Sequence, residues 1–439
     1  MKSVPVILVA VWLSTHILAT AAEPSAQRPN IVIFAPDGLR ADRIGAYGYQ
    51  HHPTTPAIDA AAGESLFFEN AEAQSSWTLP SFASLFTSQY PWEHAALWSN
   101  VKISSSSLLL SELLAMRGYR TAAFVGSPFL SPEYGFARGF GFYNADGQRY
   151  FQETLPLALN WIKSNRSPQP FFLFIHGNDL QPPFNPFLPK TVRDRFDPAY
   201  QGPASDLLLD SYFLRVFNRC EWHDRGPAPD EEYKAKVEVL RSNARALKHI
   251  GALYDAQLAR VDEAFQRLMN FLKRENLAAN TVVVLLSDHG LELGERGLLG
   301  AGDHPVSHET VTRVPLLLWG PGIAAGRRKD VVQLIDVAPT LLSLAATPSP
   351  LSYQGRDLLS PRAAPHPAIG ASTTFDASEI KEYFLRDEQW KLIYRLDTRS
   401  PELFNLADDS EERRDLSLSQ AERARKMLAD LLKLTSAPD

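Results

Sequence analysis

Five short and continuously apolar runs constrain the fold of this chain more than any other feature. Each is rich in β-branched or aromatic residues and reads as a buried strand, and together they cover residues 31–34, 121–125, 171–175, 281–286 and 315–319. Helical periodicity fills the intervals between them, notably at 106–116, 150–163 and 235–274. Strands that are apolar on both faces need covering on both sides, so the pattern predicts an α/β fold in which helices sandwich a mostly parallel sheet.

Two proline-rich stretches mark the predicted domain organisation. The first, residues 179–230, also carries many aromatic residues and is predicted to be an insertion or a lid within a catalytic domain of residues 28–346. The second, residues 347–367, precedes a few short strand-like runs and an amphipathic helix at 419–434. We therefore predict a small C-terminal α+β subdomain over residues 365–439.

The N-terminus has the parts of a signal peptide. A basic second residue precedes an apolar run over 4–18, and this run ends in the small-residue pattern Ala19-Thr20-Ala21. An uncleaved membrane anchor is the alternative, but the run is short for a membrane span and polar residues interrupt it. The sequence predicts a signal peptide at residues 1–21 and a periplasmic or secreted protein with no stable membrane span after cleavage.

Charge and cysteine content narrow the range of partners. The formal net charge is −6, and no block of Lys and Arg of the kind that binds a phosphate backbone is present. A nucleic-acid partner is therefore not expected. The single cysteine, Cys220, has no partner for a disulfide and belongs to no motif, so we interpret it as a spectator thiol.

Polar residues follow two of the predicted strands. Asp37 comes after the first strand and Asp288 and His289 come directly after the fourth. An aspartate in this place often only caps a turn, but ligands collect at the carboxyl ends of parallel strands, so we expect these side chains to meet. Two carboxylates and an imidazole suit Mn²⁺ or Zn²⁺, and Mg²⁺ or Ca²⁺ less well. The sequence predicts one divalent metal ion bound by Asp37, Asp288 and His289.

Thr78 lies where a helix is expected to begin. Apolar residues at 79, 82, 85 and 86 share one helical face, and Pro80 suits a first helical turn. As an isolated residue, Thr78 would be interpreted as an N-cap. The free N–H groups and the positive dipole end of a helix N-terminus also favour a phosphate or sulfate group beside its hydroxyl. Thr78 is therefore a candidate metal ligand and a candidate metal-activated nucleophile.

Longer motifs resemble those of a known family. The segments at 28–42, 55–59 and 76–91 look like the N-terminal half of a sulfatase, and those at 287–290, 313–315, 390–393 and 402–406 look like its C-terminal half. In family order these matches span about residues 28–416. The resemblance is to the sulfatase branch of the alkaline phosphatase superfamily. It implies that fold, a single-metal site, and attack on a sulfur or phosphorus centre.

Four positions depart from the family pattern. Sulfatases carry Cys or Ser, oxidised to formylglycine, where this chain has Thr78, so no formylglycine is expected. The motif's arginine is Phe82, one of the paired first-loop aspartates is Pro36, and a substrate-contacting histidine is Gln181. A threonine nucleophile is similar to phospho-transferring members of the superfamily, such as lipoteichoic acid synthases and phosphoethanolamine transferases.

The loop before Arg313 carries two histidines where members of the resembled family place Lys or His. His304 is the predicted acid for the leaving group, because a histidine of near-neutral pKa can protonate a departing oxygen. His308 is the second candidate for that role. His308 and Gln181 are also predicted to bind substrate. Surface histidines without a function are an equally good interpretation of this loop.

Together these residues predict a metal-dependent, sulfatase-like hydrolase. It would cleave a sulfate or phosphate ester of a small molecule, a glycan or a lipid through Thr78. One alternative is a transferase that moves a phospho-substituent to a glycan or lipid. Another is a catalytically inactive homologue that binds an anionic glycan, and the departures at Pro36, Phe82 and Gln181 favour that hypothesis.

Overall fold

The computed structural model describes residues 28–147, 149–210, 213–218, 230–360, 366–376 and 379–435. The predicted signal peptide, residues 1–21, and Cys220 both lie outside these ranges. Within them, no helix combines the length and the apolar character that crossing a membrane requires.

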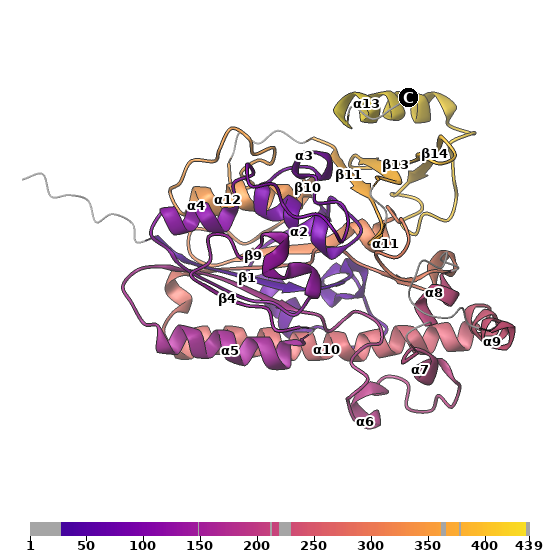
Figure 1. Cartoon of the computed structure of the whole chain (residues 1–439), viewed down its shortest axis with the longest axis horizontal. Helices are drawn as coiled ribbons and strands as arrows, with labels where there is room; N and C mark the ends of the chain where they lie inside the picture. The colour runs from indigo at the N-terminus through magenta and orange to yellow at the C-terminus, as the bar shows by residue number, and fades with distance from the viewer. Residues whose placement is uncertain are drawn as a thin grey trace, which may run out of the picture.

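A central sheet of eight strands forms the middle layer of the molecule (Figure 1). In spatial order its strands are β10 (Gly326–Gln333), β2 (Leu66–Glu72), β9 (Arg313–Trp319), β6 (Thr281–Leu286), β1 (Asn30–Pro36), β5 (Phe171–Gly177), β3 (Arg120–Phe124) and β4 (Phe142–Asn144). Neighbouring strands are parallel except at β9, which runs antiparallel to both β2 and β6. The predicted mostly parallel sheet is thus confirmed.

Helices cover both faces of the central sheet (Figure 1). One layer contains α1 (Pro56–Gly63), α5 (Phe151–Ser164) and α10 (Ala244–Arg274), and the other contains α2 (Thr78–Thr87), α4 (Leu110–Met116) and α12 (Val337–Leu344). Alternate residues of β1 serve the two layers because successive side chains of a strand point to opposite faces. Val32 and Phe34 belong to the core under α10, whereas Ile31 and Ile33 belong to the core under α2.

A second, antiparallel sheet forms the C-terminal part of the chain. Its strands, in order, are β11 (Ala368–Ser372), β12 (Glu382–Arg386), β13 (Trp390–Arg395) and β14 (Ser400–Asn405). Helix α13 (Ala421–Thr435) packs its apolar side against this sheet through Met427 and Leu431. This arrangement confirms the predicted small α+β unit after the central sheet.

Buried charged side chains join the two sheets. Lys391 on β13 is fully buried and donates to Glu309 Oε1 at 2.8 Å. Its Nζ also lies 3.6 Å from Glu72 Oε2 and 4.0 Å from Glu412 Oε1. Arg386 on β12 pairs with Glu72 at 3.1 Å and with Glu309 at 3.6 Å. Three carboxylates thus face two cations, and burial, assisted by the charge of Glu309, raises the pKa of Glu412 to about 8.

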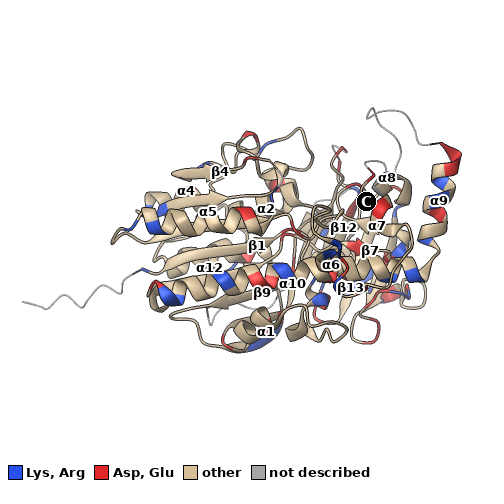
Figure 2. Cartoon of the chain, turned by 90° about the horizontal axis from the view of Figure 1, so that it is seen from below, with Lys and Arg blue, Asp and Glu red and all other residues tan. Residues whose placement is uncertain are grey.

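The observed elements differ from the predicted ones in several places. In the central sheet, strands β2, β4 and β10 were not predicted, and the helix predicted over 235–274 is two helices, α9 (Glu231–Arg241) and α10. The break falls at Asn243, whose side chain caps α10 by accepting two backbone N–H groups. Helix α9 carries charges of both signs along its exposed length (Figure 2).

Short elements complete the described chain. The proline-rich stretch contains α6 (Lys190–Arg193), α7 (Ala204–Leu207) and α8 (Phe213–Phe217). The other short α-helices and strands of the described residues are α3 (Pro91–His94), α11 (Glu309–Thr312), β7 (Glu292–Leu293) and β8 (Leu299–Gly300). The domain boundaries predicted from the sequence stay a prediction.

Candidate active site

Three adjacent strands of the central sheet end at one place. Asp37 directly follows β1, and its backbone N–H donates to Gly177 O of β5 at 3.0 Å. Asp288 follows β6 on the other side of β1. His176 is the penultimate residue of β5 and pairs in register with Ala35. The carboxyl ends of parallel strands therefore bring two carboxylates and an imidazole together, as expected for a ligand site in this class of sheet.

The loops that follow β1 and β6 are tied to each other. Ser287 Oγ lies 2.7 Å from Pro36 O and accepts the N–H of Leu39 at 2.9 Å. From the other side, Tyr254 of α10 donates its hydroxyl to Gly38 O at 3.0 Å. Gly38 has φ +76°, which a side chain rarely adopts. These contacts fix the backbone that carries Asp37 before any ligand arrives.

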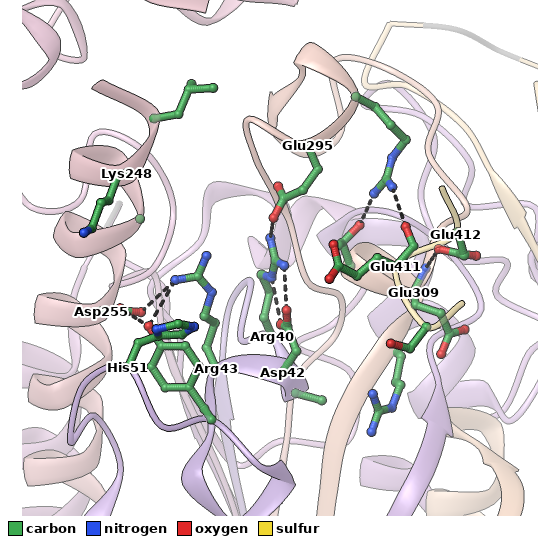
Figure 3. A pocket seen from close by; sticks show the side chains of 18 of the residues that line it. Arg40, Asp42, Arg43, His51, Lys248, Asp255, Glu295, Glu309, Glu411 and Glu412 are labelled. Atoms are coloured by element: carbon green, nitrogen blue, oxygen red, sulfur yellow. Dashed lines mark hydrogen bonds and ion pairs between the residues drawn. The ribbon is translucent and has the colours of Figure 1, made fainter. Parts of the chain in front are cut away.

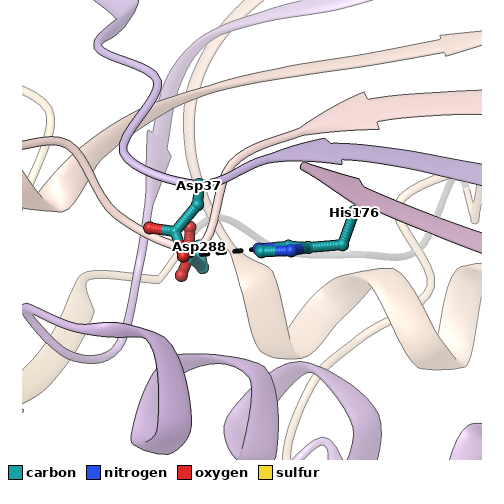
Figure 4. Close-up of side chains that lie close together, drawn as sticks. All are labelled: Asp37, His176 and Asp288. Carbon is teal, nitrogen blue, oxygen red and sulfur yellow. Dashed lines mark ion pairs between the residues drawn. The ribbon is translucent and has the colours of Figure 1, made fainter. Parts of the chain in front are cut away.

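The side chains converge on a small buried volume (Figure 4). One ligand atom each of Asp37, His176 and Asp288 lies within 4.8 Å of the others. Asp37 Oδ2 is 3.4 Å from His176 Nε2, and Asp37 Oδ1 is 3.4 Å from His289 Nε2. His289 Nε2 is also 3.3 Å from Asp288 Oδ2. At most 1 % of each of these four side chains is exposed.

This group of atoms fits a divalent metal ion. Asp288 Oδ2, His289 Nε2 and His176 Nε2 are buried and make no hydrogen bond to the described residues. Buried polar atoms without partners are costly, so their convergence indicates a site for a ligand that satisfies them. Carboxylate oxygens and imidazole nitrogens are ligands that divalent metals take.

The two imidazoles differ in the hydrogen bonds of their second nitrogen. His289 Nδ1 lies 2.5 Å from Gly290 O, so Nδ1 carries a proton and Nε2 can offer its lone pair to a metal. His176 Nδ1 accepts the backbone N–H of Gly126 at 3.3 Å. Its proton is therefore on Nε2, which faces Asp37 Oδ2 at 3.4 Å without forming a hydrogen bond. This difference favours His289 as the ligand and His176 as the residue that holds Asp37.

The pKa values in this group show two buried carboxylates that a nearby positive charge would stabilise. Burial alone would raise the pKa of Asp37, but the imidazoles of His176 and His289 hold it well below its usual range. Burial and the charge of Asp37 raise the pKa of Asp288 to about 6. Burial opposes protonation of His289, yet the charges of Asp288 and Asp37 raise its pKa to about 9. Proximity of like charges thus makes a cation favourable here.

Thr78 joins this group from helix α2. It is the first residue of the helix, with Trp77 as N-cap, and only 4 % of it is exposed. Its Oγ1 donates to Asp37 Oδ2 at 3.1 Å. Nearby, Ser81 Oγ donates to Asp288 O at 2.5 Å and fastens the first turn of α2 to the loop after β6. The structure therefore brings the predicted Thr78, Asp37, Asp288 and His289 together.

Phe82 occupies the position of the motif's arginine. It is fully buried and packs edge-on against Phe174 and against His176, with ring centroids 5.3 Å and 5.4 Å apart. The first turns of α2 therefore present an apolar ring to the imidazole of His176.

Gln181 contacts the same carboxylate. Its Nε2 donates to Asp37 Oδ1 at 2.6 Å, and the side chain passes 3.0 Å from the point where a Cβ on Gly38 would lie. Asp37 thus receives donors from both Thr78 and Gln181. The predicted contact of Gln181 with substrate stays a prediction.

The two predicted loop histidines lie in different surroundings. His304 is 7 % exposed, stands beside Asp303 at 3.5 Å, and makes no hydrogen bond to the described residues through either ring nitrogen. His308 lies against the C-terminal sheet, 4.0 Å from Glu402 and next to the ring of Phe404. Burial and the cations around it hold the pKa of His308 well below its ordinary value. The roles of both histidines stay predictions.

A separate charged cavity is lined in part by Arg40, Asp42 and Arg43, which follow β1 (Figure 3). It has a volume of about 1050 Å³, and no residue of the group around Asp37 lines it. Its charges are largely paired among themselves: Arg40 binds Asp42 and Glu295, and Arg43 binds Asp255.

His176 is the residue that sequence reasoning missed. It lies at the end of an apolar run, directly before Gly177, and belongs to none of the motifs recognised in the sequence. The available signal was a lone polar residue at the carboxyl end of a buried strand, the same edge of the sheet where Asp37 and Asp288 were already expected.

Comparisons with known proteins identify the family of this chain. A family model described as Sulfatase matches residues 29–347. Arylsulfatase K of Canis lupus familiaris is 24% identical over 442 residues, which cover 88% of this chain and 78% of that protein. The match confirms the predicted class of hydrolase acting on ester bonds.

Solved structures share the fold. A protein in complex with its substrate D-glucosamine-2-N,6-O-disulfate superposes with a TM-score of 0.73 at 21% identity, covering 93% of this chain and 97% of that one. The phosphonate monoester hydrolase of Agrobacterium radiobacter superposes with a TM-score of 0.70 at 18% identity, covering 93% and 95%. With a family model that matches most of its length, this chain belongs to the sulfatase family.

Proposed function

We propose that this chain is an exported hydrolase that cleaves an anionic ester through Thr78. The observation that carries the proposal is the hydrogen bond from Thr78 Oγ1 to Asp37 Oδ2, 3.1 Å long, at the N-terminus of α2. A hydroxyl in this place has its proton directed at a carboxylate and its lone pairs free for an electrophile. The N-terminal end of α2 favours the negative oxygens of a sulfate or phosphate group.

Asp37, Asp288, His289 and Thr78 would hold one divalent ion, with Mn²⁺ or Zn²⁺ favoured over Mg²⁺ or Ca²⁺ because of the imidazole. Such an ion would lower the pKa of the Thr78 hydroxyl and offset charge on the ester oxygens. The support is the set of unpartnered buried atoms on Asp288 and His289. His176 would act beside these ligands by holding its Nε2–H close to Asp37 Oδ2, 3.4 Å away, and so favouring one direction of that carboxylate.

Each residue would have its own role in the cleavage of the ester. Thr78 Oγ1 would pass its proton to Asp37 Oδ2 and form a bond to the phosphorus or sulfur atom while the bond to the leaving oxygen breaks. The predicted acid His304, in its protonated form, would give a proton to that oxygen; neither of its ring nitrogens makes a hydrogen bond to the described residues. Water would then attack the same centre and give a proton to His304, and Thr78 Oγ1 would leave with the proton held by Asp37.

The nature of the nucleophile favours phosphorus esters over sulfate esters. The hydrated aldehyde of a formylglycine sulfatase expels sulfate through its second hydroxyl by breaking a C–O bond, and threonine has no such hydroxyl. A phospho-threonine can be resolved by water at phosphorus, where a helix N-terminus stabilises the charge on the oxygens. Phe82 stands where the motif's arginine would supply a cation, so a bound metal ion would have to supply more of that stabilisation.

The neighbours of Thr78 suit a ring next to the ester. Trp77 packs edge-on against Phe129 and Phe375, each at 5.1 Å between ring centroids. Phe129 and Phe375 are partly exposed and stack on each other at 5.0 Å. Aromatic faces of this kind pack well on apolar faces of a substrate. We propose an ester on a glycan or on an aryl-like group as the substrate class.

The test uses purified mature protein with Mn²⁺ or Zn²⁺ and a panel of aryl sulfate, phosphate monoester, diester and phosphonate. Thr78→Ala is expected to lower kcat/KM by at least about 10³-fold, because the nucleophile is lost, and Thr78→Ser to keep part of the activity. Thr87→Ala, in the same helix, removes a hydroxyl bonded only to Ala83 O and serves as the matched control. Unchanged turnover in Thr78→Ala would refute the nucleophile.

The same panel separates the two rival functions. A transferase would give more transfer product than hydrolysis product when an alcohol is added. An inactive binding protein would bind the esters tightly and turn over none of them.

A further inference from the structure

A second cluster of chemically active side chains lies away from the group around Asp37. Ser205 on α7 places its Oγ 2.8 Å from His249 Nε2 on α10. His249 Nδ1 lies 2.9 Å from Asp197 Oδ2, in the loop between α6 and α7. A hydroxyl, an imidazole and a carboxylate are thus joined in the order and through the atoms that activate a serine nucleophile.

The protonation states support this order. Arg245 binds Asp197 through both guanidinium nitrogens, at 2.5 Å and 2.6 Å, and this pairing holds the pKa of Asp197 below its ordinary value. The carboxylate is therefore ionised and accepts the Nδ1 proton of His249. Burial, in turn, lowers the pKa of His249, so the imidazole is neutral and its Nε2 accepts the proton of Ser205.

This cluster is largely buried, and apolar side chains flank its serine. Ser205 is 9 % exposed and His249 is fully buried, with the ring of Tyr200 stacked on the imidazole at 3.8 Å. Ala204 and Leu208, on either side of Ser205, belong to the core under α10. The nearby cation, Arg245, is already paired with Asp197, so an anionic ester would gain little there. The burial and charge around Ser205 therefore favour a small, uncharged group.

We propose that Ser205, His249 and Asp197 form a second nucleophilic centre, independent of metal, that takes small uncharged acyl esters. Ser205 Oγ forms a bond to the carbonyl carbon, its proton passes to His249 Nε2, and the bond to the leaving oxygen breaks as that oxygen receives the proton. Water, deprotonated by His249, then attacks the acyl carbon, and Ser205 Oγ leaves with the proton. Carbon keeps its oxidation state throughout, and water is the co-reactant.

The test treats the purified full chain with diisopropyl fluorophosphate in the presence of EDTA and maps the product by mass spectrometry. Folded protein is expected to gain one phosphoryl group at Ser205, and guanidinium-unfolded protein to gain none. Ser205→Ala is expected to lose the label and to hydrolyse 4-nitrophenyl acetate at least tenfold more slowly than wild type. Ser242→Ala is the matched control, because that hydroxyl contacts only the backbone of α9.

Two results would overturn the proposal. One is the absence of label at residue 205 in folded wild-type protein. The other is equal ester hydrolysis, in EDTA, by wild type and by a Ser205→Ala variant whose circular dichroism and Tm show it folded. In that case the three residues serve only to fasten α7 to α10. Because EDTA removes any metal and Thr78→Ala can be treated in parallel, failure here is distinct from failure of the function proposed for Thr78.

Discussion

The imidazole of His176 lies edge-on to the ring of Phe82, with the ring centroids 5.4 Å apart and the ring planes at 76°. On its other edge, Nδ1 accepts the N–H of Gly126. These two contacts hold the imidazole with Nε2 directed at Asp37, although His176 and Asp37 come from different strands. This makes His176 a positioning residue, and its effect on metal affinity can be measured separately from that of a metal ligand.

Replacing His176 is expected to weaken metal binding without abolishing it. His176→Leu removes the N–H that faces Asp37 and should lower the affinity for Mn²⁺ or Zn²⁺ about 10- to 100-fold, the range found when groups that orient a ligand are removed. His176→Gln should recover part of the loss, because an amide N–H can still face the carboxylate. His289→Ala should remove binding altogether. Calorimetric titration of the metal-free protein measures all three, and a stronger loss in His176→Leu than in His289→Ala would reverse the assignment.

Asp288→Ala is expected to abolish metal binding while the protein stays folded. The side chain extends from a loop after β6, and the sheet core beneath it does not depend on it. Removing one of two crowded carboxylates also relieves repulsion with Asp37, so Tm of the metal-free protein should stay or rise. Metal analysis after dialysis measures the loss of binding, and a thermal melt shows whether the protein stays folded. Full metal stoichiometry in this variant would show that Asp288 is not a ligand.

Chelation and substrate choice test the chemistry. Activity should vanish with EDTA and return with Mn²⁺ or Zn²⁺, and the phosphate diester or monoester should turn over faster than the matching aryl sulfate. The reason is the single hydroxyl of Thr78, which leaves a sulfo-threonine with no internal route to resolution. Initial rates with matched aryl leaving groups give the comparison. Faster cleavage of the sulfate would favour a plain sulfatase mechanism instead.

The buried charges between the two sheets predict a pH-dependent stability. Glu412 has a folded-state pKa of about 8 against an ordinary value of 4.5, so between these values the native state binds the extra proton. Its contribution to stability is complete below about pH 4.5 and is lost as pH rises towards 8. Glu412→Gln keeps the neutral form at every pH, and its Tm should fall less between pH 6 and 8.5 than that of wild type.

The exposed Glu422→Gln on α13 is the matched control for that melt, since both variants remove one carboxylate from the same part of the chain. All other titrating groups, including His289, are common to the variants, so the difference isolates Glu412. Parallel curves for wild type and Glu412→Gln would show that Glu412 is ionised in the native protein.

The parts of the fold that the sequence predicted are those with the strongest pattern. Strands β1, β5 and β6 are apolar on both faces, and their ends located Asp37 and Asp288. Strand β2 mixes apolar and polar residues, and β10 opens with charged residues at the edge of the sheet, so neither has a continuous apolar run. The reversed direction of β9 depends on which neighbours it pairs with, which no local pattern encodes.

The same limit explains what was missed at the site. Thr78, Asp37, Asp288 and His289 each follow a local signal, a strand end or a helix start. The role of His176 depends on β5 lying next to β1 and on a backbone N–H from Gly126, fifty residues away. The Ser205 cluster is likewise a product of three segments that meet only in the folded chain.

Helix α10 links these two places mechanically. It runs unbroken for 31 residues, and it presents His249 to Ser205 and, five residues on, Tyr254 to the backbone that carries Asp37. Five residues span about 7.5 Å of helix axis and turn about 140°, so the two contacts lie on opposite sides of one stiff rod. The helix therefore holds the Ser205 cluster and the loop that carries Asp37 at a fixed spacing, and a shift of α10 along its axis would displace both hydrogen bonds at once.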